Sequence, residues 1–194
     1  MTTSQVPTRR DARRNRDLLL ATARRLFAEQ GLDVTLKEVA REAGVGVGTV
    51  YRHFPDKDAL VTALFSAQLD DEVQRAQHCA QAPDAWQALV DYLTETMRLQ
   101  ADNKGLRALM CPQGSAYRPV RECKALMNPH LDTLVASAHD QGTLKPDCTL
   151  EDIAHLQVAL VAIMDATEPE SGAYERHLAH FLAGVHASEA RRKP

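Results

Sequence analysis

Apolar residues recur every three or four positions along most of the chain, which is the spacing of one face of an α-helix. Near the start, Leu19, Ala23 and Phe27 share a face, so a helix is expected from about Asn15, and Gly31 is expected to end it. No segment shows the alternation of apolar and polar residues typical of a half-buried strand, so the pattern predicts an all-α fold. The further predicted helices cover residues 35–43, 47–53, 57–80, 84–102, 104–111, 119–141, 150–166 and 174–190.

Two of the predicted short helices have strong start and stop signals. Thr35 and Glu38 form a capping box, in which the threonine hydroxyl and the glutamate carboxylate bind free backbone amides at the helix start. Gly44 supplies the left-handed backbone that ends this helix. Pro55 and Asp56 then stop the third helix and cap the fourth.

Composition indicates a folded chain that stays in the cytoplasm. With 194 residues, of which 44% are hydrophobic, the chain can bury a sizeable core. Its longest uninterrupted apolar run, residues 158–164, is far shorter than the ~20 residues that span a bilayer, so no membrane segment is expected. The four cysteines are far apart and form no CxxC motif, so reduced and mostly buried thiols are expected at Cys79, Cys111, Cys123 and Cys148.

Charge is distributed unevenly along the chain. Residues 1–57 hold 11 Lys and Arg against 7 Asp and Glu, whereas the remaining residues hold 12 against 19. A basic N-terminal part therefore precedes an acidic body. Residues 1–14 contain four arginines and little apolar periodicity, which predicts a flexible basic arm. Plain disorder and an arginine contact with DNA both remain open for this arm.

The stretch Gly-Val-Gly-Val-Gly over residues 44–48 does not fit a nucleotide-binding loop. A dinucleotide loop needs G-x-G-x-x-G after a strand, and a P-loop needs a lysine after its last glycine. Here a predicted helix precedes the glycines and Thr49 follows them, which fits a helix-turn-helix that presents its second helix to a DNA major groove.

Individual residues of the predicted recognition helix suit DNA contacts. If Val50 and Phe54 face inward, the outward arc can place an aliphatic side chain on a thymine methyl and an arginine on a guanine edge. Hydroxyl and imidazole groups suit phosphate oxygens, and a lysine or a capping threonine at a helix start lies where an anion is favoured. The predicted DNA-binding residues are Thr35, Val47, Gly48, Thr49, Tyr51, Arg52, His53 and Lys57.

The segment TLKEVAREAGVGVGTVYRHFPDKDAL, residues 35–60, resembles the DNA-binding segment of the tetracycline-repressor (TetR) family of bacterial regulators. The family's sequence pattern appears as Ala43-Gly44-Val45, Gly48-Thr49-Val50-Tyr51, His53-Phe54, Lys57-Asp58 and Leu60, and with the preceding helix it covers about the first third of the chain. Gly46 departs from the family, which usually has a capping serine there. The resemblance implies a DNA-binding domain over residues 15–57 and a regulatory and dimerisation domain over residues 58–190. It also implies a homodimer on a palindromic operator, repression, and release by a small ligand.

Two apolar stripes near the C-terminus are candidates for the dimer interface, although both could instead be buried within one monomer. The predicted interface residues are Leu156, Leu160, Ile163, Tyr174, Leu178, Phe181 and Val185. A pocket for a small apolar or amphipathic ligand is expected within residues 84–166, although its members suit an ordinary core equally well. The predicted pocket residues are Trp86, Tyr92, Met97, Met110, Met127, His130 and Met164.

Two rival functions remain open. A helical metal-dependent enzyme would use His155, His177 and His180 with Asp152 or Asp165, but no HExxH motif accompanies them, so no catalytic residue, metal site or cofactor is predicted. A non-specific DNA-binding protein would bind any duplex with similar affinity, whereas a regulator prefers its own site. We therefore expect a transcriptional regulator that is not an enzyme and has no membrane partner.

Overall fold

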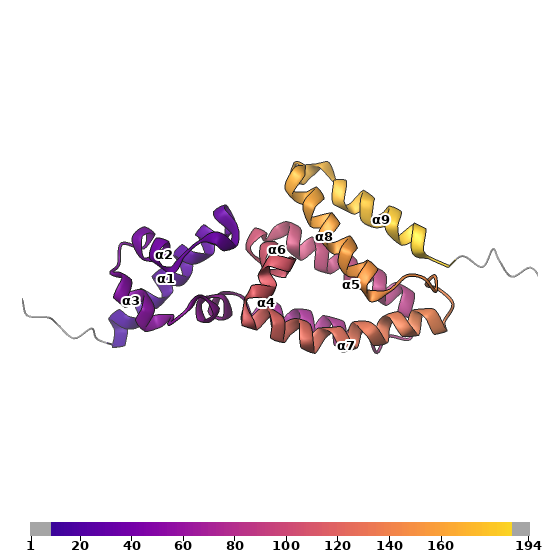
Figure 1. Ribbon diagram of the computed structural model, residues 1–194, viewed down its shortest axis with the longest axis horizontal. Helices are drawn as coiled ribbons and strands as arrows, with labels where there is room; N and C mark the ends of the chain where they lie inside the picture. Colours follow the sequence, from indigo (N-terminus) through magenta and orange to yellow (C-terminus); the bar gives the residue numbers. More distant parts are fainter. Residues whose placement is uncertain (1–8, 188–194) are drawn as a thin grey trace, which may run out of the picture. The chain divides into compact units, whose positions relative to one another are not determined.

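The computed structural model describes residues 9–187, and their regular structure is helical, which confirms the all-α prediction. In this range, extended pairing is limited to one isolated bridge between Leu144 and His186. The chain forms two compact units with their boundary between Ser66 and Ala67. The elements are α1 (Arg9–Gln30), η1 (Gly31–Asp33), α2 (Leu36–Glu42), α3 (Val47–His53), α4 (Lys57–Cys79), α5 (Ala85–Asp102), α6 (Lys104–Met110), η2 (Pro112–Ala116), α7 (Arg118–Asp140), α8 (Leu150–Ala166), η3 (Pro169–Ser171) and α9 (Ala173–Val185) (Figure 1).

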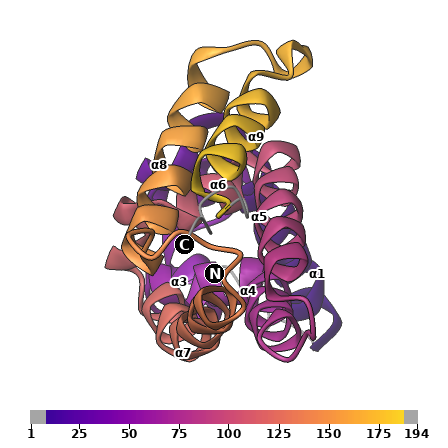
Figure 2. The ribbon, with the colours of Figure 1, turned by 90° about the vertical axis from the view of Figure 1, so that its right-hand side faces the viewer.

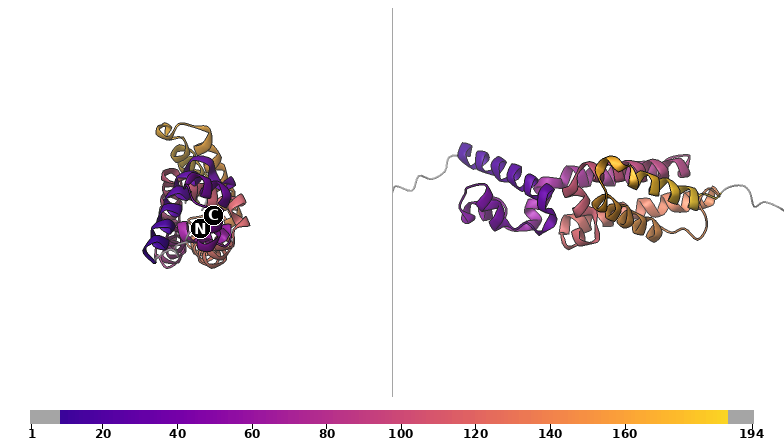
Figure 3. Two further views of the ribbon diagram at one scale, coloured as in Figure 1. Left: turned by 90° about the vertical axis from the view of Figure 1, so that its left-hand side faces the viewer. Right: turned by 90° about the horizontal axis from the view of Figure 1, so that it is seen from above.

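The N-terminal unit is built from α1, α2, α3 and the first half of α4, and α1 is seen from a second direction in Figure 3. Phe27 of α1 packs against Phe65 of α4, with ring centroids 6.2 Å apart. The unit boundary therefore falls later along α4 than the expected division after residue 57, because the first half of α4 buries its apolar face in this unit. The buried apolar residues are Leu19, Ala23, Leu26, Phe27, Val34, Leu36, Val39, Ala40, Val50, Phe54, Leu60, Val61, Leu64 and Phe65.

Helix α1 begins earlier than predicted. Residues 9–14 were expected to belong to the basic arm, but they form the first turns of α1. Arginine and alanine are good helix formers, and Asp11 lies in the first turn, where the helix dipole favours a negative charge. The rest of the predicted arm, residues 1–8, lies outside the described residues.

The C-terminal unit surrounds one hydrophobic core to which the second half of α4 and helices α5, α7, α8 and α9 contribute. Helices α8 and α9 lie side by side in this unit (Figure 2). Polar contacts join distant segments of the same unit. Arg107 of α6 pairs with Asp165 of α8 at 2.9 Å, and the Cys123 thiol of α7 donates to the Leu69 carbonyl of α4 at 3.5 Å.

Helix α9 ends at Val185, which is earlier than the predicted end at residue 190. The Lys145 N–H donates to the Val185 carbonyl at 2.9 Å, and the Ala187 N–H donates to the Thr143 carbonyl at 2.9 Å. The Trp86 ring also packs on His186, with centroids 4.4 Å apart. These contacts with a distant segment hold the backbone after Val185 in an extended conformation.

The turn between α6 and α7 requires a glycine at position 114. A Cβ atom added there would lie 1.6 Å from the Leu109 carbonyl oxygen, far closer than any van der Waals contact. The backbone of η2 can therefore fold against the end of α6 only because Gly114 has no side chain.

No helix among residues 9–187 is long and apolar enough to cross a membrane.

Candidate functional site

The turn between α2 and α3 has the geometry of a helix-turn-helix. The Val45 N–H donates to the Ala40 carbonyl at 3.0 Å and the Gly44 N–H to the Arg41 carbonyl at 3.2 Å, while Gly44 has a φ of +66°. This Schellman arrangement ends α2 and needs a left-handed residue, as the sequence predicted for Gly44. Gly46 is the N-cap of α3 and provides no side-chain hydrogen bond.

Helix α3 presents one face to the core and the other to solvent. Val50 and Phe54 are 0% and 2% exposed, whereas Val47 and Tyr51 are 41% and 45% exposed. The outward arc that the sequence predicted is therefore present. Of the other predicted contact residues, Gly48 and Arg52 are exposed, and Thr49 and His53 are half-buried.

Arg52 lies along its own helix. Its Nε donates to the Gly48 carbonyl at 3.3 Å, which directs the side chain along the outward face of α3. Since Arg52 is exposed, its terminal guanidinium nitrogens are placed where an incoming partner can reach them. Arg16 of α1 lies over the Phe54 ring at 5.6 Å, a cation–π contact that ties α1 to the end of α3.

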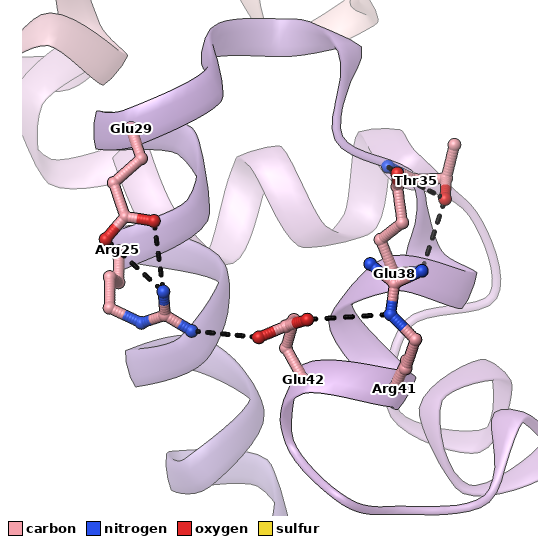
Figure 4. Close-up of polar contacts among 6 residues, drawn as sticks. All are labelled: Arg25, Glu29, Thr35, Glu38, Arg41 and Glu42. Atoms are coloured by element: carbon pink, nitrogen blue, oxygen red, sulfur yellow. Dashed lines mark hydrogen bonds and ion pairs between the residues drawn. The ribbon is translucent and has the colours of Figure 1, made fainter.

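Thr35 and Lys57 have partners within the unit. The Glu38 N–H donates to Thr35 Oγ1 at 3.2 Å, and the Thr35 N–H donates to Glu38 Oε2 at 2.7 Å, which confirms the predicted capping box (Figure 4). The Thr35 N–H and the Thr35 hydroxyl both donate to the Glu38 carboxylate and lower its pKa. The Lys57 ammonium donates to the Leu32 carbonyl and lies 6.0 Å from the centre of the Phe27 ring. Contacts of Thr35 and Lys57 with phosphate stay predictions.

A network of charged side chains fixes α2 against α1. Arg25 Nη1 lies 3.0 Å from Glu29 Oε2, and Arg25 Nη2 lies 3.4 Å from Glu42 Oε2 (Figure 4). Glu42 also pairs with Arg41 at 3.5 Å, and the Arg41 side chain is 72% exposed. The carboxylate of Glu29, and to a smaller extent that of Glu42, raises the pKa of Arg25. Sequence analysis missed this network, although the four-residue spacing of Arg25 and Glu29 is a helical ion-pair signal.

The C-terminal unit contains a cavity of about 630 Å³ that is lined by residues of α5, α7 and α8 and by residues of η2 and the end of α6. Its volume is within the range of about 300–1,000 Å³ that is typical of small-molecule sites. The residues that line it are Tyr92, Thr96, Gln100, Met110, Cys111, Pro112, Ser115, Lys124, Met127, Asn128, Leu131, Asp132, Leu150, Glu151, Ile153, Ala154, His155, Gln157, Val158 and Val161.

Three of the seven predicted pocket residues line this cavity: Tyr92, Met110 and Met127. The other four, Trp86, Met97, His130 and Met164, lie outside its lining. Helical phase explains the difference, because residues four apart share a helix face and neighbours do not. On α5 this face carries Tyr92, Thr96 and Gln100, so the adjacent Met97 turns into the core, where it is 0% exposed.

Four polar side chains of the cavity, those of Tyr92, Thr96, Ser115 and Lys124, form hydrogen bonds. The Tyr92 hydroxyl donates to the Met127 sulfur at 3.3 Å, and Thr96 Oγ1 donates to Glu72 Oε2 of α4 at 3.0 Å. Lys124 Nζ donates to Ser115 Oγ at 2.9 Å. Burial raises the pKa of Tyr92 and lowers that of Lys124. Burial also raises the pKa of Glu72, against the opposing effects of Arg75 and Thr96.

The predicted interface residues fall into two groups. Leu160 and Leu178 are 0% and 4% exposed within one chain, so their side chains belong to the core of the C-terminal unit. The remaining five are half-buried and pack against that core: Leu156, Ile163, Tyr174, Phe181 and Val185.

The histidines that an enzyme would use are not gathered with other ligands. His177 and His180 have ring centroids 6.3 Å apart, and His177 Nδ1 lies 2.8 Å from the Ala173 carbonyl oxygen of its own helix. Among residues 9–187, no three His, Cys, Asp or Glu side chains are placed to hold a metal ion together.

Comparison with known families assigns both units. Residues 19–64 match the family "Bacterial regulatory proteins, tetR family", and residues 84–187 match "Transcriptional regulator SbtR-like, C-terminal domain". The helix-turn-helix and the helical C-terminal unit thus define a class of DNA-binding transcriptional regulators. The chain belongs to the TetR family within that class.

Individual relatives agree with this assignment. The HTH-type transcriptional regulator SAUSA300_2515 of Staphylococcus aureus is 34% identical over 106 residues, which cover 50% of this chain and 54% of that protein. The chain thus spans about half the length of this curated relative. The TetR transcriptional regulator SCO0520 of Streptomyces coelicolor has a similar structure, with a TM-score of 0.55 and 28% identity over 89% of this chain and 99% of that chain.

The fold is also that of SmeT, the repressor of the Stenotrophomonas maltophilia multidrug efflux pump SmeDEF. The TM-score is 0.60, the identity 18%, and the match covers 90% of this chain and 91% of SmeT. SmeT has also been solved in complex with triclosan.

Proposed function

We propose that this regulator binds a palindromic operator as a homodimer, represses transcription there, and is released by a small ligand in its C-terminal unit. The observation that carries the proposal is the outward face of α3, where Val47, Tyr51 and Arg52 are exposed beside Gly48 while Val50 is buried. An exposed aliphatic residue, tyrosine and arginine on one helix face suit a major groove better than solvent.

Each residue of the α3 face has a distinct role in this proposal. Gly48 lets the helix backbone approach the bases, and Val47 contacts a thymine methyl. Arg52 donates two hydrogen bonds to a guanine edge, while Tyr51, Thr49 and His53 bind phosphate oxygens. The network of Arg25, Glu29, Glu42 and Arg41 keeps α2, and with it α3, at a fixed angle to α1.

The test of DNA recognition is selection of bound duplexes from a random pool, followed by anisotropy titration of the selected duplex and of a scrambled one. We expect a palindrome bound roughly 10³-fold more tightly than the scrambled duplex. Tyr51→Ala should weaken binding to both duplexes, whereas Arg52→Ala should reduce the preference between them. Leu126→Ala on α7, which is exposed and distant in sequence from the helix-turn-helix, is the control. Equal affinity for all duplexes would instead identify a non-specific DNA-binding protein.

Dimerisation is proposed to use the outward faces of α8 and α9. With Leu160 and Leu178 buried in the monomer core, the half-buried Leu156, Ile163 and Phe181 form the apolar edge of that surface. Small exposed residues beside them allow two helix pairs to approach closely. These small residues are Ala159, Ala162 and Ala166 of α8 and Ala179, Ala183 and Gly184 of α9.

Two recognition helices must reach successive major grooves, about 34–36 Å apart, so a monomer should lose specific binding. We expect the double variant Ala162→Arg and Ala183→Arg to sediment as a monomer and to leave the operator unprotected. Ala136→Arg, at an exposed position of α7, should remain dimeric. A monomeric variant that still protects the operator would refute this part of the proposal.

Ligand release is supported by the cavity and by its link to α4. Thr96 lines the cavity and donates to Glu72 of α4, the helix that begins in the N-terminal unit and ends in the C-terminal one. A ligand that favours a different position of α4 would shift the equilibrium away from the DNA-binding arrangement. SmeT, whose fold is shared, has been solved in complex with triclosan, which supports a small-molecule ligand for this regulator.

A further inference from the structure

The cavity of the C-terminal unit has an apolar wall and one cationic side chain. Its apolar lining includes Met110, Met127, Leu131, Ile153 and Val161, which come from three different helices, α6, α7 and α8. Lys124 also lines it, from the first half of α7. An apolar wall with a few placed polar groups is the usual make-up of a site that orients a small molecule.

The Lys124 ammonium is half-buried and has no acidic counter-ion. Its hydrogen bond goes to the neutral Ser115 hydroxyl at 2.9 Å, and in the described part of the chain no carboxylate lies within ion-pair distance of it. Burial lowers the pKa of Lys124, and the neighbouring Cys111 and Cys123 oppose this effect only in part. A cation withdrawn from water without a counter-ion costs free energy, so an anion that enters the cavity would recover part of this cost.

Two hydroxyl groups in the cavity can add hydrogen bonds to such an anion. Tyr92 is 1% exposed, and its hydroxyl, which also contacts the Thr96 side chain, donates to the Met127 thioether, a weak acceptor. A carboxylate oxygen would be a far stronger acceptor for it. Ser115 accepts from Lys124, which leaves its own proton available for donation.

The opposite end of the cavity is acidic. Asp132 lies eight residues after Lys124 on α7, a rise of about 12 Å along the helix. Glu151, in the first turn of α8, lies toward the same end as Asp132, because the short segment 141–149 joins the end of α7 to the start of α8. Both carboxylates are exposed and would repel a second negative charge on the ligand.

We propose that this cavity binds an apolar monocarboxylate, with its carboxylate on Lys124 and its apolar body along Met127, Leu131 and Val161. The inference names the ligand class for the regulatory unit and rests on the function proposed above. A neutral ligand would leave the Lys124 charge unpaired, and a dicarboxylate would place its second charge near Asp132 and Glu151.

The test uses isothermal titration calorimetry on the full chain with matched ligands. Octanoate and 4-phenylbutanoate are compared with their alcohols, 1-octanol and 4-phenyl-1-butanol, and octanoate is also compared with octanedioate. In the wild type we expect at least one acid to bind, and octanedioate to bind about ten-fold more weakly than octanoate. Lys124→Met should weaken the acid about ten-fold or more, as expected for the loss of a charge-assisted hydrogen bond, and change alcohol binding less than about two-fold.

Two further variants separate loss of charge from loss of fold. Lys124→Arg keeps the positive charge and should retain acid binding, and Lys104→Met, at an exposed lysine outside the cavity lining, should bind like the wild type. Failure of both acids to bind the wild type overturns the inference, as does an equal effect of Lys124→Met on acids and alcohols.

Operator titration of the same proteins distinguishes this inference from the proposed function. Acid binding that depends on Lys124 but leaves operator affinity unchanged would support the ligand class and refute ligand-dependent release. If the protein binds its operator but Lys124→Met leaves acid binding unchanged, the proposed DNA recognition is supported and the proposed ligand class is refuted.

Discussion

The two units of this regulator are both helical, but their polar contacts join residues at very different separations along the chain. In the N-terminal unit the capping box joins residues three apart, and the contacts between elements join Arg25 to Glu42 and Lys57 to Leu32, which are 17 and 25 residues apart. In the C-terminal unit the hydrogen bond from Cys123 reaches 54 residues back to Leu69, and that from Gln141 reaches 58 residues back to Pro83.

This difference determines which functional residues of each unit can be identified from the sequence. The recognition face of the N-terminal unit lies on a single seven-residue helix, so its exposed residues follow from helical spacing alone. The cavity of the C-terminal unit is lined from α5, α6, η2, α7 and α8, so its lining depends on how these elements pack. Substitutions in the two units should therefore have different effects on the free energy of unfolding and on operator binding.

The largest expected effect is that of Gly114→Ala in the C-terminal unit. The added Cβ would lie 1.6 Å from the Leu109 carbonyl oxygen, so the turn must move away from α6. We expect the free energy of unfolding to fall by about 3 kcal/mol, measured by urea denaturation. Gly46→Ala in the N-terminal unit is the matched control, because its Cβ meets only Thr49 Oγ1, at 4.0 Å. Equal losses in the two variants would show that the close approach at Gly114 is not limiting.

The next effect concerns Glu72, a buried carboxyl that links α4 to α5. Burial raises its pKa, so between the usual pKa and the raised one the folded state holds a proton that the unfolded state has released. Stability should therefore fall as pH rises through this window, by about 1.4 kcal/mol for each unit by which the pKa is raised.

Urea unfolding from about pH 4.5 to about pH 7.5 compares the wild type with Glu72→Gln, whose amide does not titrate. As pH rises, the free energy of unfolding of Glu72→Gln should increase relative to that of the wild type. Glu122→Gln, at a carboxylate that is 63% exposed, should show the same pH dependence of the free energy of unfolding as the wild type. A Glu72→Gln curve that also runs parallel to the wild type would contradict the raised pKa.

A smaller effect compares two equivalent capping boxes. Thr35 with Glu38 begins α2, and Thr149 with Asp152 begins α8. Replacing either threonine by alanine should cost about 1 kcal/mol of unfolding free energy. Only Thr35→Ala should also weaken operator binding, because α2 supports α3.

Circular-dichroism melts and operator anisotropy measure these two consequences. Thr133→Ala, which removes a hydroxyl that donates to the Pro129 carbonyl within α7, should change neither appreciably. Operator binding weakened as strongly by Thr149→Ala as by Thr35→Ala would show that the two units do not respond separately.

The smallest expected effect is a gain at Gly46. A serine hydroxyl at this N-cap can accept the Gly48 N–H, since the Thr49 N–H already donates to the Gly46 carbonyl at 2.8 Å, and the added side chain has room. Gly46→Ser should therefore raise the unfolding free energy by a few tenths of a kcal/mol, within reach of paired denaturation curves. Gly46→Ala, which adds a methyl group without an acceptor, should give no gain.

The pocket prediction shows where sequence reasoning lost accuracy. Of the residues selected by type, Tyr92, Met110 and Met127 line the cavity, whereas Met97 is buried in the core, and Lys124 was not selected. Helical phase from Tyr92 would have added Thr96 and Gln100. Helical phase from Met127 would likewise have added Lys124, which lies three residues earlier on the same face of α7.

The dimer prediction met a similar limit. Periodicity identified apolar stripes on two C-terminal helices, and both helices exist. It could not tell which members of each stripe face the chain's own core, and the structure assigns Leu160 and Leu178 to that core. The end of α9 was misplaced for the same reason, because the backbone contacts with residues 143–145 that follow it come from elsewhere in the chain.

The sequence by itself determined the all-α fold, the capping box at Thr35, the turn at Gly44 and the exposed face of α3, since each follows from contacts within a few residues of the same helix. Only the tertiary structure decided the position and extent of the cavity, the half-buried Lys124 bonded to a neutral hydroxyl, and the division of the apolar stripes between core and surface. These features depend on helices that meet after 20 to 60 residues of intervening chain, and side-chain packing at such separations has no periodic signature in the sequence.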